Sequence, residues 1–210
     1  MIIKKIVKKV LLLERVKVQF EKVFEFYVAS KYPENLKVFP YKGKIEDDKL
    51  CVAVCRRNLI DMKSVLDKIG VRFWLYYGVF LGAYRDGALI SYDKDIDLAV
   101  CVEDRLRIIY FEDEFKKFGF KRIRFTWQSV LFYRDGVTIV LLFFRNDGNK
   151  RVSGFYQYDV DAFEVYNEVY FLDRSWRIFS EPEKWLKYIY GEDWRIPQKG
   201  KPALKCPRGR

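Results

Sequence analysis

An acidic segment runs directly into an apolar one between Ser91 and Val100, and this junction constrains the fold more than any other feature. Residues two apart on a β-strand share a face, so Asp95 and Asp97 should point the same way while Ile96 faces the core. Asp93 joins them if the extended chain begins early. Carboxylates at the entrance of a buried strand cost stability unless a cation or a donor compensates them. The sequence therefore predicts a buried strand that begins with carboxylates on one face, and we call these carboxylates the acidic edge.

This acidic edge suggests a metal site. Two carboxylates about 7 Å apart along a strand can converge on one hard cation. Mg²⁺ prefers such oxygen ligands and keeps waters and substrate phosphates as its other partners. The structural alternative is a solvated acidic turn leading into a core strand, and Asp-x-Asp alone does not exclude it.

A glycine-bearing segment lies just upstream of the acids. Gly78 and Gly82 follow the strand-like run 71–77 and should open a short helix, where backbone N–H groups can approach a phosphate. Arg85 follows one turn later and could bind a phosphate with two parallel hydrogen bonds. A phosphate-binding turn followed by a metal-binding acid pair is typical of phosphoryl or nucleotidyl transfer. From these residues alone, a structural role for the segment is equally favoured.

The chain of 210 residues contains no histidine, which excludes Ser-His and Cys-His catalytic pairs and zinc sites that need histidine. The net charge of the chain is +11, but the six Lys and Arg residues of 195–210 supply +6, which leaves a net charge near +5 for the rest of the chain. Nucleic-acid binding by this tail, with Trp176, Trp185 and Trp194 stacking on bases, is an alternative that we rank below a core role for the tryptophans.

The remaining patterns predict an α+β fold with helices first, mixed strands in the middle and a helix last. Residues 1–29 form an amphipathic pattern, for which packing on the domain is favoured over contact with a membrane surface. Residues 46–69 predict a helix whose apolar face includes Cys51 and Cys55, so these cysteines are expected in the core rather than in a metal or redox site. Further elements are predicted as a strand over 96–102, a helix over 103–118, strands over 121–126, 129–134 and 137–144, two strands within 155–172, and a helix after the capping box Ser180-Glu181-Pro182-Glu183.

Two motifs resemble the LicD/fukutin-related family. The segment 74–85, Trp-Leu-Tyr-Tyr-Gly-Val-Phe-Leu-Gly-Ala-Tyr-Arg, with Ile-Ser-Tyr-Asp-Lys-Asp-Ile-Asp over 90–97, is similar to the family pattern W-L-x-x-G-T-L-L-G-x-x-R followed by I-P-W-D-D-D-I-D. Residues 190–197, Tyr-Gly-Glu-Asp-Trp-Arg-Ile-Pro, resemble its closing Y-G-x-x-W-x-x-P. The resemblance covers about 50–198, with the close matches in 74–98 and 185–197.

The resemblance implies a nucleotidyltransferase-like mixed β-sheet flanked by helices. It implies transfer of a phospho-substituent, phosphocholine or an alditol phosphate, from a CDP-linked donor to a glycan hydroxyl. By motif match, Asp95 and Asp97 would bind Mg²⁺ (or Mn²⁺), with Asp93 as a supporting acid. Gly78, Val79, Gly82 and Arg85 would occupy the positions that handle the donor phosphates.

Three positions depart from the family pattern. Val79 replaces a Thr or Ser, and Lys94 replaces an acid. Val140 stands where a family strand normally carries a third aspartate, and its face should lie beside Asp95 and Asp97. The missing carboxylate leaves three alternatives: a weaker metal site, a substitute acid such as Asp135, Asp147 or Glu168, or a degenerate protein that only binds nucleotides or nucleic acid.

These patterns divide the chain into an N-terminal amphipathic helix and connection (1–45), a nucleotidyltransferase-like domain (46–198) and a basic flexible tail (199–210). The cysteines lack a disulfide-framework spacing and no secretory signal is recognised, so a cytoplasmic location is expected. The lysine-rich first helix adds peripheral membrane contact as a further expectation.

Overall fold

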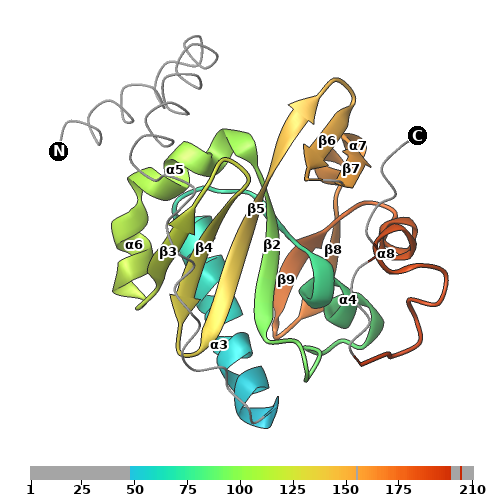
Figure 1. The fold of residues 1–210 in the computed structure, drawn as a ribbon, viewed down its shortest axis with the longest axis horizontal. Coiled ribbons are helices and arrows are strands. Elements are labelled where there is room, and N and C mark those ends of the chain that lie inside the picture. The colour runs from blue at the N-terminus through green and yellow to red at the C-terminus, as the bar shows by residue number, and fades with distance from the viewer. Residues whose placement is uncertain (1–47, 155, 200–203, 205–210) are drawn as a thin grey trace.

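The computed structural model describes residues 48–154, 156–199 and 204 (Figure 1). The amphipathic helix predicted for 1–29 and its connection lie outside the described residues, as does the basic tail apart from Lys199 and Leu204. Among the described residues, no helix is both long enough and apolar enough to cross a membrane.

A mixed β-sheet forms the centre of the domain, as predicted. Strand β2 runs parallel to β5, and the other neighbouring strands are antiparallel. The order across the sheet is β1 (Phe73–Leu75), β2 (Asp95–Cys101), β5 (Val137–Asp147), β4 (Ser129–Arg134) and β3 (Lys121–Phe125). The last part of β5 also pairs with β6 (Lys150–Ser153), which pairs with β7 (Tyr156–Asp159).

Helices on one face of the sheet build its main core. Helix α3 (Asp48–Lys68) contacts β2 and β5, and Cys51 and Cys55 are buried on it as predicted. Phe115 of α6 (Glu112–Lys117) stacks on Phe132 of β4, with ring centroids 4.5 Å apart. These contacts bury the side chains that face the helices, and the opposite face remains available for a site.

A second group of elements packs beside β1 and β2 (Figure 1). It comprises α4 (Tyr77–Arg85), α7 (Asp161–Glu164), the hairpin of β8 (Asn167–Phe171) and β9 (Arg174–Ile178), and α8 (Pro182–Tyr190). Tyr76 and Tyr158 lie buried where these elements meet, and their hydroxyls form a 2.9 Å hydrogen bond. The three tryptophans considered for base stacking are buried, which confirms that they have a core role: Trp176, Trp185 and Trp194.

The parallel pairing of β2 and β5 fixes which residues share a face. Asp97 is paired with Val140, and Asp95 with Thr138. Ile96 and its partner Ile139 are fully buried on the face that the helices cover, whereas Asp97 and Val140 are half-buried on the other face. The predicted position of Val140 beside the acid pair is therefore confirmed.

Some local predictions were wrong in detail. The helix predicted over 103–118 is divided into a 3₁₀ turn (Val102–Asp104), α5 (Arg105–Tyr110) and α6, with Phe111 outside helical geometry. The run Ile108-Ile109-Tyr110-Phe111 has low helix propensity, which favours a break there. Of the two strands predicted within 155–172, β7 and β8 form with α7 between them, and β9 was not anticipated.

The capping box before α8 does not form. Pro182 begins the helix as predicted, but Glu181 adopts a left-handed conformation with φ of 50°. The hydroxyl of Ser180 instead donates to the carbonyl of Asp161, and its backbone N–H donates to the carbonyl of Ala162. A tertiary contact has replaced the local cap.

A buried polar network joins α3 to the sheet. Arg134 of β4 is 8% exposed and donates to Asn58 Oδ1 (2.7 Å), to Asp61 Oδ2 (2.7 Å) and to the carbonyl of Phe118 (2.6 Å). Asn58 is fully buried and returns a hydrogen bond to the carbonyl of Arg134. Every donor and acceptor in this network depends on a partner from another element.

We expect Asn58→Ala to lower the free energy of unfolding by about 2–4 kcal/mol, because the buried Nε–H and the carbonyl of Arg134 both lose their hydrogen bonds to Asn58. Arg57→Ala is the matched control, since Arg57 pairs with Asp135 at an exposed position and should contribute at most about 1 kcal/mol. Urea denaturation of both variants measures the difference. Equal losses would contradict the role assigned to the network.

Candidate active site

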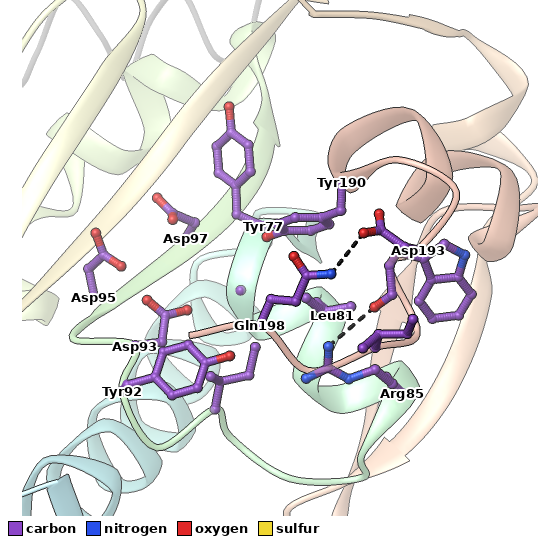
Figure 2. A pocket seen from close by; sticks show the side chains of 14 residues that line it. Tyr77, Leu81, Arg85, Tyr92, Asp93, Asp95, Asp97, Tyr190, Asp193 and Gln198 are labelled. Atoms are coloured by element: carbon purple, nitrogen blue, oxygen red, sulfur yellow. Dashed lines mark hydrogen bonds between the residues drawn. The ribbon is translucent and has the colours of Figure 1, made fainter. Parts of the chain in front are cut away.

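Three aspartates gather at one side of a pocket of about 450 Å³. Asp95 and Asp97 extend from the first part of β2, and Asp93 from the turn before it, where its N–H donates to the carbonyl of Ile90. Figure 2 shows the three carboxylates directed toward this pocket. The structure thus brings together the acids that the sequence singled out.

Burial and the neighbouring carboxylates raise the pKa values of Asp93 and Asp97. Burial, then the charge and hydrogen bond of Asp95, raise the pKa of Asp93 to about 7. Burial, followed by the charges of Asp95 and Asp93, also raises the pKa of Asp97 well above its usual range. These are not the properties of a solvated acidic turn, and without a cation the crowded negative charge destabilises the site.

Gly78 lies directly against this acidic cluster. It lies in the first turn of α4, and a Cβ atom added there would overlap the carboxylate of Asp93. The glycine is therefore needed so that Asp93 can lie against the start of the helix. Tyr76, the N-cap, provides no side-chain hydrogen bond to this first turn.

Gly82 and Val79 have a different environment from the one predicted. Both are buried in α4, and neither lines the pocket. A Cβ atom on Gly82 would overlap the backbone carbonyl of Ala88, so this glycine allows the following loop to pack on the helix. Of the predicted glycine pair, only Gly78 faces the pocket.

Arg85 lines the pocket, but its guanidinium is engaged by the protein. Nε and Nη2 donate to the two carboxylate oxygens of Asp86 at 2.8 and 2.7 Å, and Nη1 donates to the carbonyl of Trp194 at 3.2 Å. Phosphate binding by Arg85 stays a prediction. In this structure the side chain joins α4 to the segment that follows α8.

The acidic cluster fits a hard divalent cation through its oxygen donors. Within the part of the chain that the structure describes, no three acidic or cysteine side chains are arranged to bind one metal ion together. Val140 is the residue paired with Asp97, so the neighbouring strand adds no third carboxylate. A Mg²⁺ ion would thus take Asp95 and Asp97 as protein ligands and obtain the rest from water and substrate phosphates.

None of the three proposed substitute acids lines the pocket. Asp135 pairs with Arg57 at the turn between β4 and β5. Asp147 ends β5 near Arg145, and Glu168 accepts a hydrogen bond from Ser175 on the β8–β9 hairpin. The structure gives no support to a replacement of the third carboxylate by these residues.

Several pocket residues were not singled out as site residues from the sequence. Tyr77 precedes Gly78 with a left-handed φ of 42°, a strained conformation for tyrosine. Further ones come from the C-terminal segment and include Tyr190, Asp193 and Gln198. The closing motif over 190–197 was a signal for this region, but it gave no reason to choose one residue within it.

Comparisons with known proteins cover the segment that contains these residues. The family described as LicD/FKTN/FKRP, nucleotidyltransferase domain, matches residues 70–188, which contain the acids and α4. The human ribitol-5-phosphate transferase FKTN is 29% identical over 190 residues, covering 82% of this chain and 40% of the relative. The human ribitol 5-phosphate transferase FKRP is 41% identical over 54 residues, or 26% of this chain and 11% of the relative. This chain therefore spans less than half the length of these relatives.

A solved structure supports the fold. The solution structure of the antibiotic-resistance factor ANT(2'')-Ia has a TM-score of 0.52 with 16% identity, covering 72% of this chain and 78% of that one. At this level of identity the likeness concerns the fold alone. The predicted α+β, nucleotidyltransferase-like architecture is confirmed.

The two glycines of α4 should respond differently to alanine. Gly78→Ala should leave the melting temperature nearly unchanged, because only the end of the Asp93 side chain must move, but it should weaken Mg²⁺ binding several-fold. Gly82→Ala meets backbone instead and should destabilise the fold by about 1–3 kcal/mol. Thermal melting and metal titration of both variants separate the two roles. The assignment fails if Gly78→Ala unfolds the domain and Gly82→Ala does not.

Val140→Asp tests the metal site directly. The new carboxylate would lie beside Asp97, so the variant should be destabilised without metal and recover with Mg²⁺ by a larger melting shift than the wild type shows. Leu142→Asp is the matched control, since Leu142 lies on the same face of β5, is half-buried and is paired with Ala99. If both variants lose stability equally and ignore Mg²⁺, no metal binds next to Asp97.

Proposed function

Because this chain belongs to the LicD/FKTN/FKRP nucleotidyltransferase-domain family, we propose that it is a Mg²⁺-dependent transferase. It would move a phospho-substituent from a CDP-activated donor to a hydroxyl group of a glycan. The observation that carries the proposal is the cluster of Asp93, Asp95 and Asp97 against the glycine-containing start of α4, at the edge of a pocket.

The geometry supports a simple division of roles. Asp95 and Asp97 would hold Mg²⁺, which supplies positive charge to the donor diphosphate. Asp93 lies against Gly78 and helps position this edge of the pocket. The acceptor oxygen forms a bond to phosphorus, the phosphorus–oxygen bond to the cytidine phosphate breaks, and the hydroxyl proton passes to a carboxylate or to water.

We infer that the transferred group is an alditol phosphate rather than phosphocholine. Quaternary ammonium groups are bound by the open faces of aromatic rings. Two aromatic residues of the pocket, Trp194 and Tyr190, are almost fully buried, and the Trp194 ring is covered by the Arg195 guanidinium at 4.3 Å. Tyr77 and Tyr92 are half-buried, so the choice rests on the polar groups and on the relatives. The polar groups of Asp193 and Gln198 can hydrogen-bond hydroxyl groups, and the two human relatives are named as ribitol phosphate transferases.

A second candidate is a degenerate member of the family that binds a nucleotide without transferring its substituent. Val140 beside Asp97 is the observation that favours it, because two carboxylates hold the metal less firmly than three. Nucleic-acid binding ranks lower, since the tryptophans available for stacking are buried. A cytoplasmic location with peripheral membrane contact remains a proposal that rests on the basic N-terminal segment.

We expect isothermal titration to detect CDP-ribitol binding that requires Mg²⁺ and falls at least tenfold in Asp97→Asn. Asp173→Asn is the control, because Asp173 is exposed and pairs with Arg56 on the β8–β9 side. Release of CMP in the presence of a glycan acceptor then distinguishes a transferase from the degenerate alternative. A folded protein that binds neither CDP-ribitol nor CDP-choline with Mg²⁺ would end the proposal.

A further inference from the structure

The end of the pocket opposite the acidic cluster is built by the segment after α8. Tyr190, Asp193, Trp194, Ile196 and Gln198 line it, and all but Tyr190 lie beyond that helix. Figure 2 shows Asp193 well separated from Asp95 and Asp97, with Gln198 reaching into the space between them. The family match over 70–188 ends before this wall, and most of the wall falls within residues 190–197, which resemble the family's closing motif.

Helix α4 holds the middle of the wall. Arg85 Nη1 donates to the carbonyl of Trp194, and the ring of Tyr84 lies 6.0 Å from that of Trp194. Leu204 lies close to the end of α8, because its N–H donates to the carbonyl of Ile189 at 2.7 Å. The wall is therefore attached to α4 at Trp194.

Asp193 and Gln198 form the polar edge of this wall. Gln198 Nε2 donates to Asp193 Oδ2 at 2.8 Å. An ionised carboxylate only accepts hydrogen bonds, so this contact fixes which end of the amide faces Asp193. A carboxylate has about four acceptor positions and an amide nitrogen two N–H groups, so the pair can accept from and donate to a ligand as well.

Apolar side chains flank this polar edge. Leu81, Ile90 and Ile196 line the same pocket. A flat ligand with an apolar face and hydrogen-bonding groups on its rim matches such a combination. A nucleobase has this character, whereas a diphosphate belongs at the acidic, metal-binding end.

We propose that Asp193, positioned by Gln198, reads the nucleobase of the donor by accepting a hydrogen bond from an exocyclic amino group. The inference rests on the proposed function, which places the phosphates at Asp95 and Asp97. In a pyrimidine nucleotide, C4 is the ring atom farthest from the sugar, so a base that extends across the pocket presents its C4 substituent to Asp193. Cytosine has an amino donor there.

This contact would discriminate cytosine from uracil. Uracil has a carbonyl oxygen at C4, and that oxygen would face an acceptor-only carboxylate with no proton between them. Asparagine at position 193 would remove this repulsion, because its amide can donate to the carbonyl as well as accept from an amine. Asp193 is thus assigned as a specificity-determining residue, and Arg85 as a positioning residue that acts through Trp194.

The test is titration of the full chain with CMP, UMP and AMP in the presence of Mg²⁺. The wild type should bind CMP at least tenfold more tightly than UMP, and Asp193→Asn should reduce this ratio toward one. Glu192→Gln removes the same charge one residue away, at an exposed side chain that pairs with Lys187, and should leave the ratio unchanged. Gln198→Ala should lower CMP affinity and the ratio together, and it tests the pair if Asp193→Asn fails to fold.

The outcomes separate this inference from the proposed function. If CMP binds and neither Asp193→Asn nor Gln198→Ala changes the CMP to UMP ratio, base reading by the pair is wrong while the proposed function stands. If the folded wild type prefers AMP, the cytosine assignment is overturned. If it binds no nucleotide, the proposed function fails, and the inference fails with it.

Discussion

The contact between Asp93 and Gly78 is the constraint on which the acidic side of the site depends. The carboxylate lies in the space that any side chain at position 78 would fill, so Asp93 can keep this position against α4 only when residue 78 is glycine. Tyr77, just before it, adopts a strained left-handed conformation, and Tyr76 donates its N–H to the carbonyl of Asp97. The start of α4 is thus fixed against β2 by the Tyr76 hydrogen bond, next to the contact between Gly78 and Asp93.

Crowding the carboxylates has an energetic cost that other parts of the domain must offset. The pKa of Asp93, about 7, lies above its unfolded value, so the folded metal-free protein retains a proton that the unfolded chain releases. Stability should therefore fall as the pH rises from about 4 to 7 unless a cation binds. The buried Tyr76–Tyr158 pair supplies packing and a hydrogen bond next to the start of α4, and the Arg134 network stabilises the sheet from the α3 side, which allows the strain to persist.

The acidic edge could be predicted from the sequence because its information is local. Alternation over Asp95-Ile96-Asp97 places the acids on one face, and a single assumption about the order of strands places Val140 beside them. The partners of Arg85 could not be predicted in this way. Its contacts join residues 85 and 194, and the free guanidinium expected from the sequence is paired with Asp86 and a carbonyl. Ser180 shows the same limit, since a distant carbonyl replaced its local cap.

The two ends of the pocket are therefore held in place by different kinds of interaction. Its acidic end is set by strand pairing and by one glycine, both within the residues that match the family. Its opposite end is a loop that α4 holds through the hydrogen bond from Arg85 to the carbonyl of Trp194. Changes in the loop can alter Asp193 or Gln198 without disturbing the sheet, because neither residue contributes to strand pairing. The proposed phosphate transfer and the proposed choice of nucleobase can then vary independently on one fold.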